Sequence, residues 1–243
     1  MRYRQVLSWI VIIAGWQIAS IFVGNSLLLP SFTEVLLRMI SLMFQSKLYN
    51  NTIATLVRVV IGCGWALVFA LLTGISSGLK KNIREWLTPL VTLSKTIPNI
   101  TYMFMVLVWL GSEGSVTVIV FLILFPVLYS QILSGMISIN PELLDVSRMY
   151  PETFLNRLTK VILPMLWPSL MEGIKTALSL GFKVGVMAEI LGQVQTGIGQ
   201  QLYLGRINLD MVAIFAWTGW MILLSVLIDF ILNTVITVSE RDR

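Results

Sequence analysis

Long apolar runs dominate this chain, and they constrain its fold more than any other feature. Six segments are each long enough to cross about 30 Å of hydrocarbon, which takes about 20 helical residues. They span residues 6–24, 52–79, 86–110, 116–138, 165–190 and 209–237. Only 12% of the 243 residues are charged, about half the share in a soluble domain. The sequence therefore predicts an all-α membrane protein, with about six transmembrane helices in a single domain over residues 1–243.

The lysines and arginines that flank these runs predict the orientation. With the N-terminus inside, the inner flanks hold Arg2, Arg4, Lys80, Lys81, Arg84, Arg148, Arg157, Lys160, Arg241 and Arg243, and the outer flanks hold Arg38, Lys47 and Arg206. Cytoplasmic loops carry the excess of basic residues, so we expect both termini in the cytoplasm of a multi-pass cell-membrane protein. Run 6–24 is expected to be a retained helix, because no small-residue cleavage site follows it.

The composition excludes several kinds of site. The chain has no histidine and one cysteine, Cys63, which removes His-based triads and metal sites and any intrachain disulfide. No segment matches the glycine-rich loop that cradles nucleotide phosphates. We therefore expect no catalytic residue, no metal and no cofactor on this chain. The net charge of +5 comes from the flanks of the apolar runs, which indicates topology and not nucleic-acid binding.

One polar segment, residues 139–164, interrupts the apolar pattern on the predicted inner side. Asn140 suits the cap of a helix, and Pro141 suits its first turn. Glu142 and Asp145 follow where the helix dipole favours acids. The sequence thus predicts a short helix at the start of the segment.

A second short helix is predicted over residues 153–162. Pro151 ends the first helix or begins the second, because the residue before a proline is pushed out of the α region. Leu163-Pro164 is expected to break the second helix before the fifth span. Two amphipathic helices joined at a bend expose apolar and charged groups together, which is typical of a docking surface.

The spacing inside this segment resembles the cytoplasmic signature of ABC-importer permeases, E-A-A-x3-G-x9-I-x-L-P. The matching residues are Asp145, Val146, Ser147, Pro151, Val161, Leu163 and Pro164. Pro151 stands where the family usually has glycine. Further matching pieces are Leu29-Pro30-Ser31, Arg58 to Gly62, Ile97-Pro98, Trp109-Leu110-Gly111, Phe125-Pro126, Ala188-Glu189 and Gly197-Ile198-Gly199. Over nearly its whole length, the chain resembles the six-span permeases of nitrate/sulfonate/taurine-type importers, which include carriers of thiamine-precursor pyrimidines. It departs from them at 99–103, where a second proline is usual.

This resemblance implies a set of partners. A separate ABC ATPase, in two copies, would bind ATP and magnesium and contact the coupling residues Glu142, Asp145, Val146, Ser147, Arg148, Pro151, Leu163 and Pro164. Two permease copies, expected to be a homodimer in the lipid bilayer, would enclose the substrate path. A solute-binding protein would deliver a sulfonate-, taurine- or nitrate-like anion, or a thiamine-precursor-like heterocycle, to the outer face.

Charges inside a membrane span are costly and usually face protein or water, so they mark candidate path residues. On a helical wheel, Lys183 lies about 160° from the small-residue stripe at Gly181 and Gly185, and Glu189 lies about 40° from Gly185. Lys183 and Glu189 are both candidate path residues, and Lys183 is the candidate for lining the path of an anion. The alternative is a structural pair of Lys183 with Glu189, Asp229 or another subunit.

Three further interpretations concern the spans. Lys95 and Pro98 are candidate path residues, because a broken helix commonly lines a cavity. Arg58 is interpreted as an anchor that reaches the membrane interface. The small-residue stripes, Gly74/Gly78 and Ala177/Gly181/Gly185, are interpreted as helix-packing surfaces.

Two other function classes compete with the importer. An ion-gradient-driven secondary carrier or channel predicts paired acidic residues at mid-membrane, which the sequence does not show. A membrane-embedded enzyme predicts a cluster of His, Asp or Ser-Lys at one depth, and the chain has no histidine.

Overall fold

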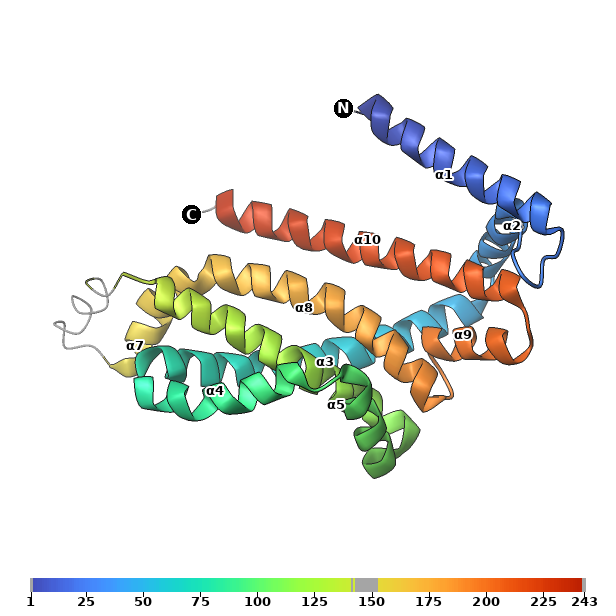
Figure 1. Ribbon diagram of the computed structural model, residues 1–243. Helices are drawn as coiled ribbons and strands as arrows, with labels where there is room; N and C mark the ends of the chain where they lie inside the picture. The colour runs from blue at the N-terminus through green and yellow to red at the C-terminus, as the bar shows by residue number, and fades with distance from the viewer. Residues whose placement is uncertain (1, 141, 143–152, 242–243) are drawn as a thin grey trace.

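The computed structural model describes residues 2–140, 142 and 153–241 of the chain. Every regular element in those ranges is a helix (Figure 1). They are α1 (Arg2–Val23), α2 (Phe32–Met43), α3 (Ser46–Leu79), α4 (Lys81–Thr96), α5 (Asn99–Ser138), α7 (Phe154–Arg157), the π-helical turn η1 (Leu158–Ile162), α8 (Leu163–Gly192), α9 (Ile198–Ile207) and α10 (Met211–Arg241).

Three of these helices are long and apolar enough to cross a membrane, namely α3, α5 and the Met211–Thr234 part of α10. Leu7–Val23 in α1 is a shorter apolar helix. At 30 residues α8 is also long enough, but it carries four charges, at Glu172, Lys175, Lys183 and Glu189. The prediction of an all-helical membrane protein is confirmed, and the count of six spans stays a prediction.

The centre of the protein is formed by α3, α5 and α8, which run side by side (Figure 1). Their close approach depends on glycine. A Cβ atom on Gly74 of α3 would lie 2.8 Å from Ile132 Cγ2 of α5, and one on Gly181 of α8 would lie 2.9 Å from Leu124 Cδ1 of α5. Such distances leave no room for a side chain, so both small-residue stripes pack helices, as predicted.

A second apolar cluster joins α2 and α10 to the central helices, with Val35, Phe182 and Trp217 buried in it. The start of α2 is fixed by a capping box, in which Ser31 Oγ accepts from the Glu34 amide and Glu34 accepts from the Ser31 amide. The Glu34 carboxylate accepts hydrogen bonds from the Ser31 N–H and from the Ser31 hydroxyl. Both bonds hold the pKa of Glu34 below its ordinary value. Ser31, and not Thr33, is therefore the cap of α2.

The predicted third span, 86–110, is divided between two helices. α4 ends at Thr96 and α5 begins at Asn99, with Pro98 between them. Pro98 has no N–H to donate to the carbonyl of Ser94, four residues earlier. The Tyr102 hydroxyl donates to that carbonyl instead, at 3.1 Å. Pro98 therefore breaks the span as predicted, at a position where a side chain satisfies the freed carbonyl.

Two other prolines, Pro89 and Pro126, lie inside α4 and α5 and end neither helix. The link between the predicted spans 86–110 and 116–138 is also shorter than expected. Only Gly111 leaves helical geometry, with φ 68° and ψ −174°, a backbone conformation open to glycine almost alone. Ser112 already continues the helix, so one residue redirects α5.

The predicted break at Leu163-Pro164 is wrong. The backbone stays helical through Ile162 and Leu163, and α7, η1 and α8 follow one another without a gap. Pro164 is the second residue of α8 and directly follows the π turn and Leu163. The π turn before it widens the helix there, which relieves the clash between a proline ring and the preceding turn.

The rest of segment 139–164 is described only in part. The Asn140 side-chain oxygen accepts from the Glu142 main-chain N–H at 3.0 Å, in keeping with a cap at Asn140. The predicted first helix beyond Glu142 and the bend at Pro151 lie outside the described residues, as do Asp145, Val146, Ser147 and Arg148.

Candidate functional site

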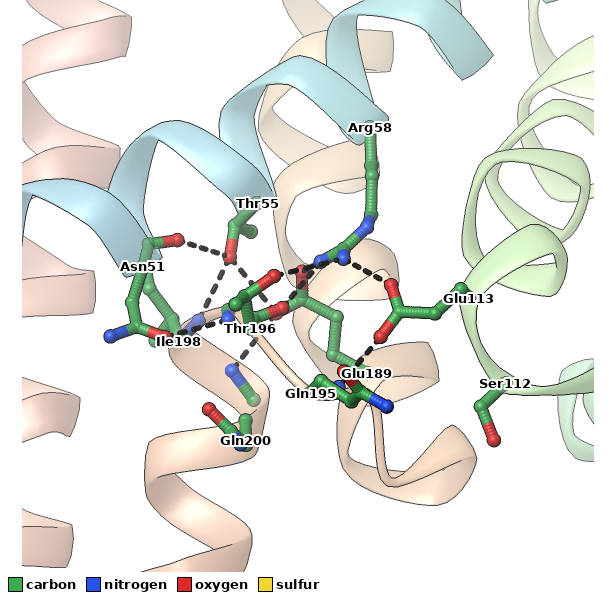
Figure 2. A network of polar contacts seen from close by, with 12 residues as sticks. Asn51, Thr55, Arg58, Ser112, Glu113, Glu189, Gln195, Thr196, Ile198 and Gln200 are labelled. Carbon is green, nitrogen blue, oxygen red and sulfur yellow. Dashed lines mark hydrogen bonds and ion pairs between the residues drawn. The ribbon is translucent and has the colours of Figure 1, made fainter.

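A fully buried carboxylate, Glu189 near the end of α8, is the centre of a polar network (Figure 2). Its Oε1 accepts from Arg58 Nη1 at 2.8 Å, and its Oε2 accepts from the Thr55 hydroxyl at 2.9 Å. The main-chain N–H of Gly199 also donates to Oε2, at 2.9 Å. An unpaired buried charge costs several kcal/mol. Glu189 is instead paired and hydrogen-bonded, and it joins α8 to α3 and to the start of α9.

Arg58 of α3 connects this carboxylate to a second one. Its Nη2 lies 2.6 Å from Glu113 Oε2 on α5, and its Nη1 also donates to the Thr196 carbonyl at 2.6 Å. The Arg58 side chain is only 14% exposed, whereas that of Glu113 is 49% exposed. The interpretation of Arg58 as an interfacial anchor is wrong, because its largely buried guanidinium is held by the carboxylates of Glu113 and Glu189.

The loop between α8 and α9 is fixed by the same side chains. The Gln195 N–H donates to Glu113 Oε1 at 2.6 Å, and the Gly197 N–H donates to Asn51 Oδ1 at 2.7 Å. The Ile198 N–H, at the start of α9, donates to Thr55 Oγ1 at 2.9 Å. The first N–H groups of a helix have no partner within it, and here α3 and α8 provide the acceptors. We call Asn51, Thr55, Arg58, Glu113, Glu189 and Thr196 the Glu189 cluster.

Sequence reasoning missed most of this cluster. Asn51, Thr55 and Arg58 follow one another at spacings of four and three, which places them on one face of a helix. That polar stripe in an otherwise apolar run is a readable signal. Glu113 gave no comparable signal, because its role depends on the redirection of α5 at Gly111.

A second polar feature is an open cleft of about 400 Å³ between α8 and α10. Its lining residues are Glu172, Lys175, Thr176, Ser179, Leu180, Lys183 and Asp229. We call it the α8–α10 cleft. Lys183 is exposed and Glu189 is buried, as the helical wheel predicted. The alternative pair of Lys183 with Glu189 is wrong, because Glu189 is paired with Arg58.

The other predicted path residues, Lys95, Pro98 and Glu189, do not line this cleft. Lys95 Nζ donates to the Ser130 hydroxyl at 2.6 Å, which links the end of α4 to the middle of α5. The Ser130 hydroxyl in turn donates to the Pro126 carbonyl at 2.7 Å. The two candidate lysines therefore belong to different surfaces, one on α4 and α5 and the other on α8 and α10.

Comparison with known proteins decides the class. Residues 66–241 match the profile of the family described as the binding-protein-dependent transport system inner membrane component. The chain belongs to this family. The match takes in the second part of α3, all of α5, α8 and α10, and the signature segment, so the family rests on more than the short motif.

Several relatives of this permease are named as permease proteins of solute transport systems. It is 26% identical over 195 residues to the putative aliphatic sulfonates transport permease protein SsuC of Bacillus subtilis, covering 79% of this chain and 70% of that one. It is 24% identical over 196 residues to the taurine transport system permease protein TauC of Escherichia coli, covering 78% and 71%. It is 25% identical over 191 residues to the formylaminopyrimidine transport permease protein ThiX of Halalkalibacterium halodurans, covering 78% and 76%.

The fold of this permease is also found in a solved transporter. An inward-facing structure of the MetNI methionine ABC transporter aligns with a TM-score of 0.70 at 18% identity, over 77% of this chain and 94% of that one. The chain is a membrane-embedded permease subunit of an ABC importer. Such a subunit works with an ATPase and with a solute-binding protein.

Proposed function

We propose that this permease moves a small solute inward across the cell membrane and that segment 139–164 conveys the motion of the ATPase to α8. The observation that carries the proposal is the unbroken helical path from α7 through η1 into α8. Because helices are stiff, a displacement of α7 moves α8 as well. α8 carries Glu189 and all of the cleft-lining residues except Asp229, so a movement of α8 acts on both the Glu189 cluster and the α8–α10 cleft.

The contact with the ATPase is assigned to the coupling residues, which lie in and beside the signature. They are Glu142, Asp145, Val146, Ser147, Arg148, Pro151, Leu163 and Pro164. The spacing of the family signature supports this assignment. ATP and magnesium would bind to the ATPase, since the sequence of this chain has no phosphate-binding loop of its own.

The assembly is proposed to hold two permease copies, as a homodimer, and two ATPase copies. The lysine and arginine bias supports a cytoplasmic location for both termini. The names of the relatives support a small solute, either an anion such as a sulfonate or a heterocycle such as a formylaminopyrimidine.

Charge reversal in the signature tests the coupling role. Asp145→Lys or Arg148→Glu is expected to abolish the stimulation of ATP hydrolysis by solute and binding protein in the reconstituted complex. Lys81→Glu is the matched control, because Lys81 is exposed and makes only an exposed pair with Glu85 at 3.7 Å. Unchanged stimulation in both signature variants would contradict the coupling role.

Co-purification tests the importer against the ion-gradient-driven carrier or channel. The tagged permease is expected to bring down an ATP-binding subunit, and depletion of ATP is expected to stop solute uptake. Uptake that persists without ATP, from a permease that brings down no ATPase, would favour the carrier.

A further inference from the structure

The α8–α10 cleft has the properties of a solute site. Glu172, Lys175, Thr176, Ser179 and Lys183 follow one another on α8 at spacings of three, one, three and four, so they share one helix face. Asp229 faces them from α10. The volume of about 400 Å³ falls within the ~300–1,000 Å³ of small-molecule sites.

The charges of this cleft balance, yet they do not pair with one another. It holds two cations, Lys175 and Lys183, and two anions, Glu172 and Asp229. Among the described residues, none of the four has an ion pair within 4.0 Å. Glu172 accepts one long hydrogen bond, from Gln131 Nε2 at 3.4 Å. Glu189, by contrast, is fully paired. The difference indicates that the four charged side chains of the cleft are available to bind a solute.

The apolar setting makes unpaired charges costly. Asp229 lies within Met211–Thr234, a segment long and apolar enough to span the membrane. A charge within such a helix is costly, with ~2.5–3.5 kcal/mol at the helix centre even on insertion scales, and Asp229 lies five residues before the end of this segment. A charge of this kind marks a substrate or ion path when it faces a cavity, and Asp229 faces the α8–α10 cleft together with Glu172, Lys175 and Lys183 of α8.

The balance of charge discriminates between classes of solute. A simple anion would pair with the lysines but would be repelled by Glu172 and Asp229. A neutral heterocycle would leave all four charges without a partner. A small zwitterion, with an ammonium group at one end and an anionic group at the other, complements both pairs of charges.

We propose that the α8–α10 cleft binds a small zwitterion, whose sulfonate or carboxylate lies at Lys175 and Lys183 and whose ammonium lies at Glu172 and Asp229. The hydroxyls of Thr176 and Ser179 lie along the same face of α8 and provide further hydrogen bonds. The proposal rests on the importer function and narrows its solute to one class.

Equilibrium binding to the purified permease–ATPase complex, in lipid nanodiscs without binding protein, tests this proposal. The probes are radiolabelled taurine and β-alanine, both zwitterions, with ethanesulfonate and ethylamine as analogues that each keep one charge. The zwitterions are expected to bind saturably and at least tenfold more tightly than either analogue. Equal affinity for ethanesulfonate would overturn the proposal in favour of an anion site.

Two neutral variants locate the site. Lys183→Gln and Asp229→Asn are each expected to weaken taurine binding at least tenfold, whereas Lys81→Gln, far from the cleft in sequence, leaves it unchanged. Unchanged affinity in both cleft variants would overturn the proposal. If a variant fails to assemble with the ATPase, the selectivity order of the wild-type complex decides alone.

Failure of this proposal is distinguishable from failure of the importer function. A complex that contains the ATPase and hydrolyses ATP, but binds no zwitterion, rejects the zwitterion site and retains the importer. A disulfide formed readily between Lys183→Cys of one copy and Asp229→Cys of a second copy would also overturn the proposal, because the occupant of the cleft would then be the partner permease.

Discussion

The two carboxylates that hold Arg58 differ in burial, and this difference predicts unequal effects of their removal. Glu189 is fully buried and accepts from Arg58, Thr55 and Gly199. Glu189→Ala leaves a buried guanidinium without its inner partner, and breaking such a pair costs ~3–5 kcal/mol. Glu113 is half-exposed, so Glu113→Gln removes an ion pair worth at most ~1 kcal/mol.

Thermal unfolding of the purified permease measures both effects. A chain of ~150–250 residues loses ~2–4 °C in Tm for each kcal/mol of lost stability. Glu189→Ala is therefore expected to lower Tm by about 6–20 °C, and Glu113→Gln by no more than about 4 °C. Hydrogen exchange at 193–199 is expected to rise in Glu189→Ala, because the Gly199 N–H loses its acceptor.

A double variant supplies the control. Arg58→Met with Glu189→Leu removes both charges together and is expected to recover part of the loss, since apolar replacement of a buried pair is often neutral. Equal Tm shifts for Glu189→Ala and Glu113→Gln would refute the reasoning, because burial would then not determine the contribution of the pair. A double variant less stable than Glu189→Ala would refute it as well.

Three further predictions concern the backbone. Gly111→Ala places a side chain in a conformation nearly restricted to glycine, and it is expected to cost ~1–3 kcal/mol, measured as a fall in Tm; an unchanged Tm would show that α5 is redirected without strain. Tyr102→Phe leaves the Ser94 carbonyl at the Pro98 break without its donor, at a cost of ~1–3 kcal/mol, and faster hydrogen exchange around the break is the readout. Ser31→Ala removes the α2 cap at a cost of ~0.5–2 kcal/mol. Because the folded pKa of Glu34 lies below its ordinary value of 4.5, its contribution is present above that pH and is lost as pH falls through the folded value. Exchange protection of the first turn of α2 should follow this pH dependence in the wild type and lose it in Ser31→Ala.

The features that sequence predicted well are those with local causes. The sequence predicted a helix cap at Asn140, and its side chain accepts from the Glu142 N–H, because both partners lie within one turn. The Gly181/Gly185 stripe predicted tight packing, and the angle of Glu189 from that stripe agreed with its burial. Each of these inferences needed only the period of a helix.

The features that the sequence did not predict depend on partners far away in the sequence, or on a residue type that is compatible with two different local structures. The pair of Arg58 with Glu189 spans 131 positions, and nothing local to either residue names the other. At Leu163-Pro164, a proline that breaks a helix and a proline that lies within a continuous helix look the same in sequence. The π turn at Leu158–Ile162 decides between them, and it is visible only in the backbone.

α8 differs from the other long helices in how its polar residues are arranged. Near its C-terminal end Glu189 is paired with Arg58 of α3, while Lys175 and Lys183 in its middle face an open cleft. Paired charges resist displacement, because separating them exposes a buried carboxylate, whereas unpaired charges in a cleft gain energy when an occupant arrives. A displacement of α7, transmitted through η1, would therefore move the middle of α8 more easily than its C-terminal end. α8 would then pivot about the Glu189 cluster, and the shape of the α8–α10 cleft would change.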